Sequence, residues 1–125
     1  GAAAVLTSDG AAPGAANQCT LPSGAAFGCR VVVVAREVGG AGTAKAVWDF
    51  LALARRDGTA ATTLVTASPA AGTGQAPALS AGTVTGWTAQ LGPDTANGAL
   101  AVTVTGAAGK TINWAARVMS VEAVG

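Results

Sequence analysis

The feature that most constrains the fold of this chain is an alternation of apolar and polar side chains with a period of two. Residues 99–105, ALAVTVT, place a leucine and two valines on one face and threonines on the other. Successive side chains of a β-strand point to opposite faces of a sheet, so this pattern predicts a strand with one buried face and one face in water. The 3.6-residue period of an amphipathic helix is hard to find, and we therefore expect an all-β fold.

Further alternating or β-branched segments recur along the chain, separated by glycine, proline, asparagine and aspartate residues that favour turns. The longest aliphatic run is VVVV at residues 31–34, and an unbroken run of this kind predicts a strand buried on both faces. The strands predicted besides 99–105 are 17–21, 29–38, 45–56, 59–65, 83–91 and 112–119.

The segment 45–56, KAVWDFLALARR, is the one ambiguous element, because its alanines and leucines also suit a helix. As a strand it would place Trp48, Phe50 and two alanines on one face, and the RDG sequence that ends it favours a hairpin turn. We expect a strand here and keep a helix as the alternative.

The turn-favouring residues between the strands predict three connections, at residues 67–78, 92–98 and 106–110. We expect the first of these loops to be the most exposed. No linker interrupts the chain, so we expect one domain over residues 1–125 with six to eight strands, an antiparallel β-sandwich of jelly-roll type. Because the first residue is glycine rather than methionine, we also expect the chain to be a processed product or a piece of a longer protein.

The three tryptophans are the side chains best suited to contact a sugar, because a flat indole can stack on a sugar ring. Trp114 shares its predicted strand face with Ile112 and Val118, so we expect it to be buried in the core. Recognition, if this domain performs it, is expected to use loops, whose irregular polar backbone adapts to a partner. The candidate glycan-binding residues are Gln75, Trp87 and Asn97.

Only 10% of the residues are charged and 50% are apolar, whereas about 25% are charged in an ordinary soluble domain. So few charges indicate a surface partly shielded by partner subunits, and we expect a homo-oligomer. A formal net charge of +1 without a basic cluster argues against a nucleic-acid partner. No apolar run approaches the ~20 residues of a membrane span, so we expect no membrane insertion.

The composition also limits the chemistry. The chain contains no histidine, the usual base that activates a serine or cysteine nucleophile. Its six carboxylates stand mostly at predicted turns and strand ends, where solvation explains them better than a catalytic pair does. We expect Asp94 and Asn97 to cap their own loop, and we expect no enzymatic activity, no metal site and no cofactor.

Cys19 and Cys29 flank the turn-like sequence LPSGAAFG. A hairpin would bring the two thiols together, and a disulfide closing so short a loop would contribute about 3 kcal/mol to stability. The alternative is a pair of small apolar side chains with free thiols.

Three stretches together resemble a known family. Residues 5–27, 31–65 and 87–122 are similar to a β-rich module found near the ends of tailed-phage tail fibres and tailspikes. The most specific part is DTANGALAVTVTGAAGKTINWAARV, residues 94–118, which resembles the family pattern DTTNGALKVTVTGEAGKTIRWVARV. The chain departs from that pattern in having cysteines at positions 19 and 29 instead of larger apolar residues, and Ala107 where an acidic residue is common.

This resemblance implies a virion structural protein that forms a homotrimer, contacts other virion subunits and is assembled in the host cytoplasm. It implies no enzyme activity and supplies no binding residue that can be carried over to this chain. Because virion proteins fold in a reducing cytosol, it also favours free thiols at Cys19 and Cys29.

The function that we expect is a tail fibre or tailspike domain for assembly and for attachment to a bacterial surface polysaccharide. A purely structural capsid decoration or head-fibre protein is the first alternative. A carbohydrate-binding module is the second, and it would require an exposed row of aromatic side chains, although only 4% of the residues are aromatic.

Overall fold

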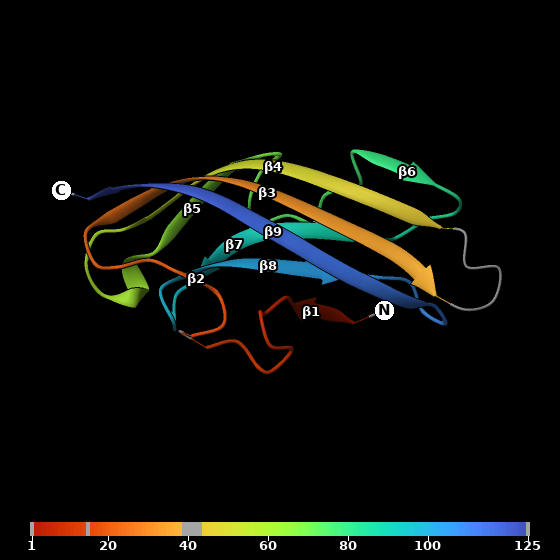
Figure 1. Ribbon diagram of the computed structural model, residues 1–125, viewed down its shortest axis with the longest axis horizontal. Coiled ribbons are helices and arrows are strands. Elements are labelled where there is room, and N and C mark those ends of the chain that lie inside the picture. Colours follow the sequence, from red (N-terminus) through yellow and green to blue (C-terminus); the bar gives the residue numbers. More distant parts are fainter. Residues whose placement is uncertain (1, 15, 39–43, 125) are drawn as a thin grey trace.

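The structure, a computed structural model, describes residues 2–14, 16–38 and 44–124. In this part of the chain nine strands form two antiparallel sheets that pack face to face (Figure 1). The single helical element described is the 3-10 turn η1 (Ala60–Thr62). The predicted all-β sandwich is confirmed.

Sheet A is built around β8 (Ala99–Thr105). β7 (Thr88–Asp94) pairs antiparallel with the whole length of β8. The short strands β1 (Ala3–Val5) and β2 (Cys19–Thr20) pair with opposite ends of β8. Since β7 occupies one edge of β8, both short strands lie along its other edge.

Sheet B is larger and is built around β3 (Ala25–Val38), which pairs with β4 (Lys45–Arg56) on one side and with β9 (Thr111–Val124) on the other. β5 (Leu64–Ser68) and β6 (Leu79–Ala81) pair with opposite ends of β4. β9 is therefore an edge strand, and no described strand pairs with its outer edge.

The core lies between the two sheets and is formed by alternate residues of each strand. In β4 the burial alternates as predicted, because Trp48, Phe50 and two alanines are buried while Leu51 and Leu53 are 64% and 52% exposed. The helix alternative for residues 45–56 is therefore wrong. In β8 the predicted apolar face is also buried, and its threonines are half-exposed.

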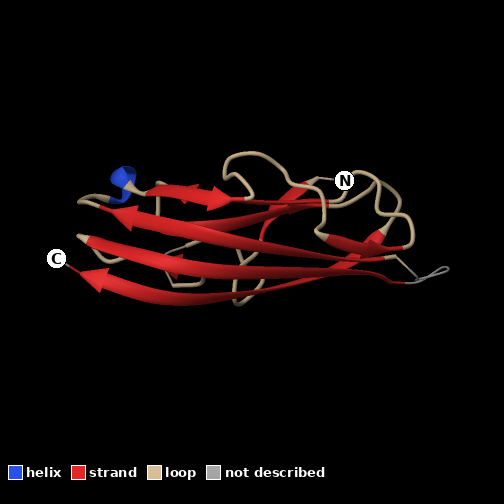
Figure 2. Ribbon diagram, turned by 90° about the horizontal axis from the view of Figure 1, so that it is seen from above, coloured by secondary structure: helices blue, strands red, loops and turns tan. Residues whose placement is uncertain are grey.

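The run of four valines in β3 is not buried on both faces, contrary to the prediction. Val31 and Val33 are fully buried, but Val34 is 48% exposed. The outer face of sheet B explains the difference, because none of the described elements lies over it, as the view onto this face shows (Figure 2). A run of β-branched residues favours the strand conformation on either face and does not report a second covering layer.

Several boundaries also differ from the prediction. Residues 60–62 turn as η1, so the strand expected at 59–65 begins only at Leu64. The strand expected from residue 83 begins at Thr88, because the backbone N–H of Trp87 closes a turn onto the oxygen of Val84. The strand predicted at 17–21 forms only as the two residues of β2. β1 and β6, of three residues each, are too short to show a period and were not predicted, which is why the described count exceeds the predicted six to eight.

Candidate functional site

The three tryptophans meet inside the sandwich. Trp48 of β4 and Trp87, next to β7, are 1% and 2% exposed. The ring centroid of Trp114, on β9, lies 5.3 Å from that of Trp48 and 6.3 Å from that of Trp87. Both distances lie within the range of about 4.5 to 7 Å of favourable aromatic pairs, and the tilts of 35° and 52° fall between the stacked and the edge-to-face arrangements.

Trp114 itself is only half-buried, so the prediction that it is a core residue is wrong in part. Its strand face does point inward, because Trp114 and Val118 are in register with the buried Ala35 and Val31 of β3. Further along this face, however, Ala116 is exposed and Val118 is half-buried. The reason is that β9 runs along the open side of the sandwich, where sheet A does not fully cover it.

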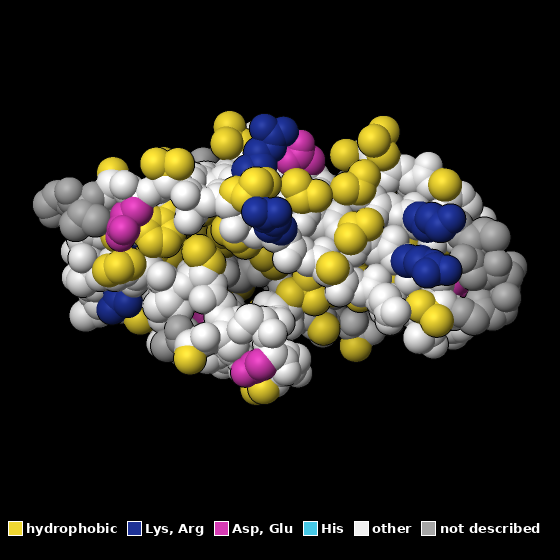
Figure 3. All heavy atoms as spheres, in the orientation of Figure 1, with side chains coloured by type: hydrophobic (Ala, Val, Ile, Leu, Met, Phe, Trp, Pro, Cys, Tyr) yellow, Lys and Arg dark blue, Asp and Glu magenta, His cyan; other side chains and the backbone are white. Residues whose placement is uncertain are grey.

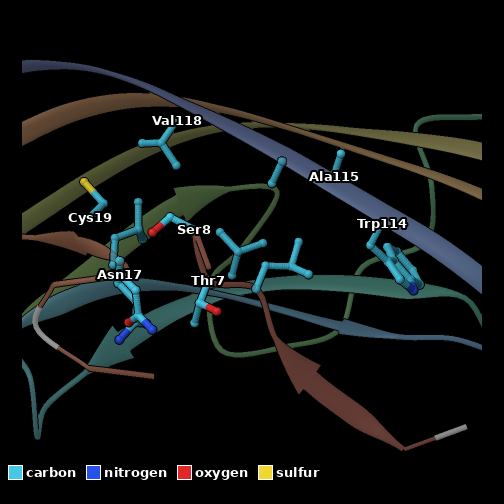
Figure 4. Close-up of a pocket in the computed structure, with 12 residues that line it drawn as sticks. Thr7, Ser8, Asn17, Cys19, Trp114, Ala115 and Val118 are labelled. Carbon is cyan, nitrogen blue, oxygen red and sulfur yellow. The ribbon is translucent and has the colours of Figure 1, made fainter. Parts of the chain in front are cut away.

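A cavity of about 440 Å³ lies on this open side, between β9 and the segments of sheet A that face it. The space-filling view shows the hollow near the middle of this side, with hydrophobic side chains around it (Figure 3). In the close-up, Trp114 lies at one end and Asn17 and Cys19 lie at the other, while Val118 reaches down from β9 (Figure 4). The lining residues are Leu6, Thr7, Ser8, Asn17, Gln18, Cys19, Leu100, Val102, Trp114, Ala115, Ala116 and Val118.

Asn17 organises the loop at the polar end of the cavity. Its Oδ1 accepts a hydrogen bond from the backbone N–H of Gly14 at 2.8 Å, and its Nδ2 donates to Asp9 Oδ1 at 2.9 Å and to the Ala12 oxygen at 3.0 Å. The hydrogen bond from Asn17 is also the main cause that lowers the pKa of Asp9. These contacts occupy both donor hydrogens of Asn17 with the loop itself.

Gln18 differs from Asn17, because its side-chain oxygen has no hydrogen-bond partner among the described residues. Its Nε2 donates to Asp94 Oδ2 at 2.8 Å and to the Gly14 oxygen at 3.3 Å. Its Oε1 is buried and has no hydrogen-bond partner among the described residues. Because this oxygen is buried, it is also out of reach of a molecule in the cavity, and its lack of a partner costs free energy.

The structure does not bring the three predicted glycan residues together. Trp87 is buried, so its ring has no free face for a sugar. Gln75 forms a bridge with Ala89 near the start of β7, and Asn97 lies in the turn beyond the other end of that strand. The sequence analysis did not single out Gln18 or residues 6–8. No local sequence pattern marks them, because they reach the cavity only through the pairing of β1 and β2 with β8.

Asp94 and Asn97 cap their own loop, as predicted. Asp94 Oδ1 accepts hydrogen bonds from the backbone N–H groups of Ala96 and Asn97, both at 3.0 Å, and its Oδ2 accepts one from Asn97 Nδ2 at 2.7 Å. The Asn97 amide, together with Gln18, lowers the pKa of Asp94. The side-chain donors of Asn97 are thus engaged at least in part by the loop.

Both cysteines are free thiols. They do not face each other across a hairpin, because Cys19 belongs to β2 in sheet A and Cys29 to β3 in sheet B. Burial raises the pKa of the Cys19 thiol. Burial also raises the pKa of Cys29, to about 11, and the nearby Cys19 thiol adds to this rise. Cys29 is thus an apolar core residue, as the alternative interpretation of the sequence proposed.

The outer face of sheet B exposes an unusual number of large apolar side chains. It is formed by alternate residues of β3, β4, β5 and β9, whose register places them side by side. Isolated exposed leucines are normal on a protein surface, but a contiguous set marks an interaction surface. We call it the outer apolar face, and Leu79 of β6, paired with Val47 of β4, belongs to it as well. Its most exposed residues are Val34, Val38, Leu51, Leu53, Leu64, Leu79, Met119 and Val121.

The same face carries most of the positive charge. Five of the seven cations have their side chains on it. Asp49 lies on the face and Asp57 pairs with Arg55 at 3.4 Å, so the excess is three positive charges. Asp49 pairs with Arg30 at 2.7 Å, and both are partly exposed. Arg36 and Lys45 stand directly opposite each other across β3 and β4. The five cations are Arg30, Arg36, Lys45, Arg55 and Arg117.

The described residues contain no cluster of three or more potential metal-ligating His, Cys, Asp or Glu side chains. None of their helices has the length and apolar character needed to span a membrane.

Comparison of the chain with protein-family models, with curated proteins and with solved structures finds no match.

Proposed function

We propose that this chain is a structural domain of a phage tail fibre or tailspike, which assembles with copies of itself and attaches the particle to a bacterial surface polysaccharide. The observation that carries the proposal is the outer apolar face of sheet B. The resemblance of residues 94–118 to the tail-fibre pattern adds the virion context.

Assembly explains why this face is exposed in a single chain. Leu51 and Leu53 lie side by side with Arg30 and Gly28 of β3 on a surface that no described element covers. Burying apolar area of this kind contributes about 25 cal/mol per Å², which makes association favourable once a partner of matching shape is available. A homotrimer of a fibre would supply such a partner at high local concentration.

The capsid or head-fibre alternative shares the assembly step and differs in location. Antibody labelling of particles distinguishes them, because labelling of the head shell alone would favour the alternative. The carbohydrate-binding module receives less support, because Phe27, Phe50, Trp48 and Trp87 are all buried and leave no exposed aromatic row in the described residues.

The assembly is tested by native mass spectrometry and sedimentation of the parent chain and of a Leu51→Ser, Leu53→Ser variant. We expect the parent to form trimers and the variant to be monomeric. Because both side chains are more than half exposed, the variant should unfold at nearly the same denaturant concentration as the parent.

Gln90→Lys is the matched control, since Gln90 belongs to the outer-facing, half-exposed set of β7 in sheet A. It should leave the trimer intact. A parent chain that stays monomeric at high concentration would contradict the proposal.

A further inference from the structure

The positive charge of the outer apolar face is only partly balanced by carboxylates. Arg30 donates two hydrogen bonds to Asp49, at 2.9 and 2.7 Å, and Arg55 lies 3.4 Å from Asp57. Among the described residues, no carboxylate lies within ion-pair distance of the other three cations of the face, which account for its whole excess of positive charge. These three are Arg36, Lys45 and Arg117.

Two of these cations stand opposite each other. Arg36 of β3 is in register with Lys45 of β4 on one side and with Asn113 of β9 on the other, and all three side chains are exposed. In the space-filling view, Lys and Arg side chains lie next to each other where β3 ends and β4 begins (Figure 3). Like charges directly opposite each other destabilise a pair of strands. An anion bound between the two cations would remove that cost.

The next row of side chains along this face is apolar. Its members lie in register across β6, β4, β3 and β9 and are Leu79, Val47, Val34 and Ala115. Leu79 is 72% exposed and Val34 is 48% exposed. Apolar surface of this kind suits the C–H groups of a sugar ring, because contact between them removes both from water.

Arg117 lies beyond this apolar row. It is in register with Val32, whose neighbour on the other side is Asp49. Because Asp49 already accepts hydrogen bonds from Arg30 through both of its oxygens, it is not available to Arg117. Val32 and Arg36 are four residues apart on β3, so at about 3.3 Å per residue the two charged rows are about 13 Å apart. The face thus offers two positive positions separated by an apolar strip.

We propose that this part of the outer apolar face binds an acidic polysaccharide, with one sugar carboxylate between Arg36 and Lys45, sugar rings over the apolar row and a further carboxylate at Arg117. The planar guanidinium of arginine matches a carboxylate through two parallel hydrogen bonds, and lysine adds a point charge. Asn113 offers donors and an acceptor to the sugar hydroxyls. This inference rests on the proposed attachment to a surface polysaccharide, whose class it names, and it moves recognition from the predicted loops to sheet B.

The apolar side chains on which assembly depends lie further along the face. Leu51 and Leu53 follow Lys45 on β4 by six and eight residues, which correspond to about 20 Å and about 26 Å. An oligosaccharide bound between Arg36 and Lys45 therefore leaves both leucines free to pack against another copy. The two proposals can be tested separately.

The test is a titration of the isotope-labelled chain with an oligomer of galacturonic acid at neutral pH, followed by the backbone amide signals. We expect saturable shifts at Arg36, Lys45 and Asn113, with a dissociation constant on the order of 1 mM at about 0.05 M ionic strength, because exposed ion pairs are individually weak. At about 0.5 M, binding should be at least fivefold weaker, whereas association between copies should not weaken. The methyl-esterified oligomer, which has the same sugars without the charges, should also bind at least fivefold more weakly.

Single substitutions locate the site. Arg36→Gln and Lys45→Gln should each lower the affinity at least threefold. Both variants should unfold at the same denaturant concentration as the parent or a slightly higher one, because the repulsion between the opposed charges is removed. Arg55→Gln is the matched control, since it removes one positive charge from the same face ten residues, or about 33 Å, from Lys45. Its affinity should equal that of the parent, because this distance exceeds the screening length.

Three results would overturn the inference: an oligomer that does not saturate, a methyl ester that binds equally well, and an Arg55→Gln variant that loses as much affinity as Lys45→Gln. The third would mean unspecific attraction to a positive surface. Polyglutamate that binds more tightly at the same residues would assign the site to an acidic protein instead. Trimers that bind no acidic oligomer would reject this inference and leave the assembly proposal standing. A monomeric parent that binds the oligomer at Arg36 would do the reverse.

Discussion

The tryptophans show how residues of one type take different positions in the same cluster. Trp48 is fully enclosed, and its Nε1 donates to the Gln75 oxygen at 2.8 Å. Trp114 contacts the same cluster but also lines the cavity, so part of its surface is already in contact with water. The free energy that each ring contributes to folding should differ accordingly.

Trp48→Ala is expected to cost about 3 to 5 kcal/mol of unfolding free energy, as truncation of a core aromatic does. It also removes one of the two hydrogen bonds that the Gln75 oxygen accepts, the other coming from the Ala89 N–H at 3.2 Å. Trp114→Ala should cost clearly less, because fewer buried contacts are lost. Urea denaturation of both variants measures the difference. Equal losses would show that the cavity is closed in solution.

Asp94 gives a prediction about acid stability. Hydrogen bonds from the Asn97 amide and from Gln18 lower its pKa in the folded state below the ordinary value of 3.8. A carboxyl group with a lowered pKa stabilises the fold at pH values above its unfolded pKa, and the contribution is lost as the pH falls through the folded value. Between about pH 5 and about pH 3, the parent should therefore lose more stability than the Asp94→Asn variant. Parallel losses, measured by denaturation at both pH values, would contradict this assignment.

At the scale of elements, β3 and β9 are of the same length but differ in their surroundings. β3 pairs on both edges, whereas β9 pairs with β3 alone among the described strands. The backbone groups of an edge strand alternate between the ladder and the solvent. β9 also lacks proline and lysine, two of the usual protections of an edge, and carries only Arg117 and Glu122 as charges.

Amide hydrogen exchange should reflect this difference. In the monomeric Leu51→Ser, Leu53→Ser variant, we expect protection along all of the central part of β3 but at every second residue only in β9. Continuous protection of β9 in that variant would mean that its outer edge is covered. NMR-detected exchange resolves the two patterns residue by residue.

At the scale of the whole molecule, charge and apolar area lie on the same side. The outer apolar face has an excess of three positive charges, although the net charge of the chain is +1. Copies that pack through this face must bring like charges together, so apolar burial has to outweigh their repulsion.

Association through this face should therefore strengthen with salt. Raising the ionic strength from about 0.05 M to about 0.5 M shortens the screening length and weakens the repulsion between the arginines, so the association constant measured by sedimentation should rise. An association constant that falls with salt would indicate that the face meets an acidic surface instead.

The sequence determined the elements with a clear period, and the tertiary structure decided what covers them. The alternation in residues 45–56 and 99–105 was enough to predict both strands and their buried faces, because the side-chain period of a strand is fixed by local geometry. The exposure of Val34, the half-burial of Trp114 and the unpaired Oε1 of Gln18 could not be predicted in the same way. Each depends on whether a distant strand lies opposite, and no local pattern of residues carries that information.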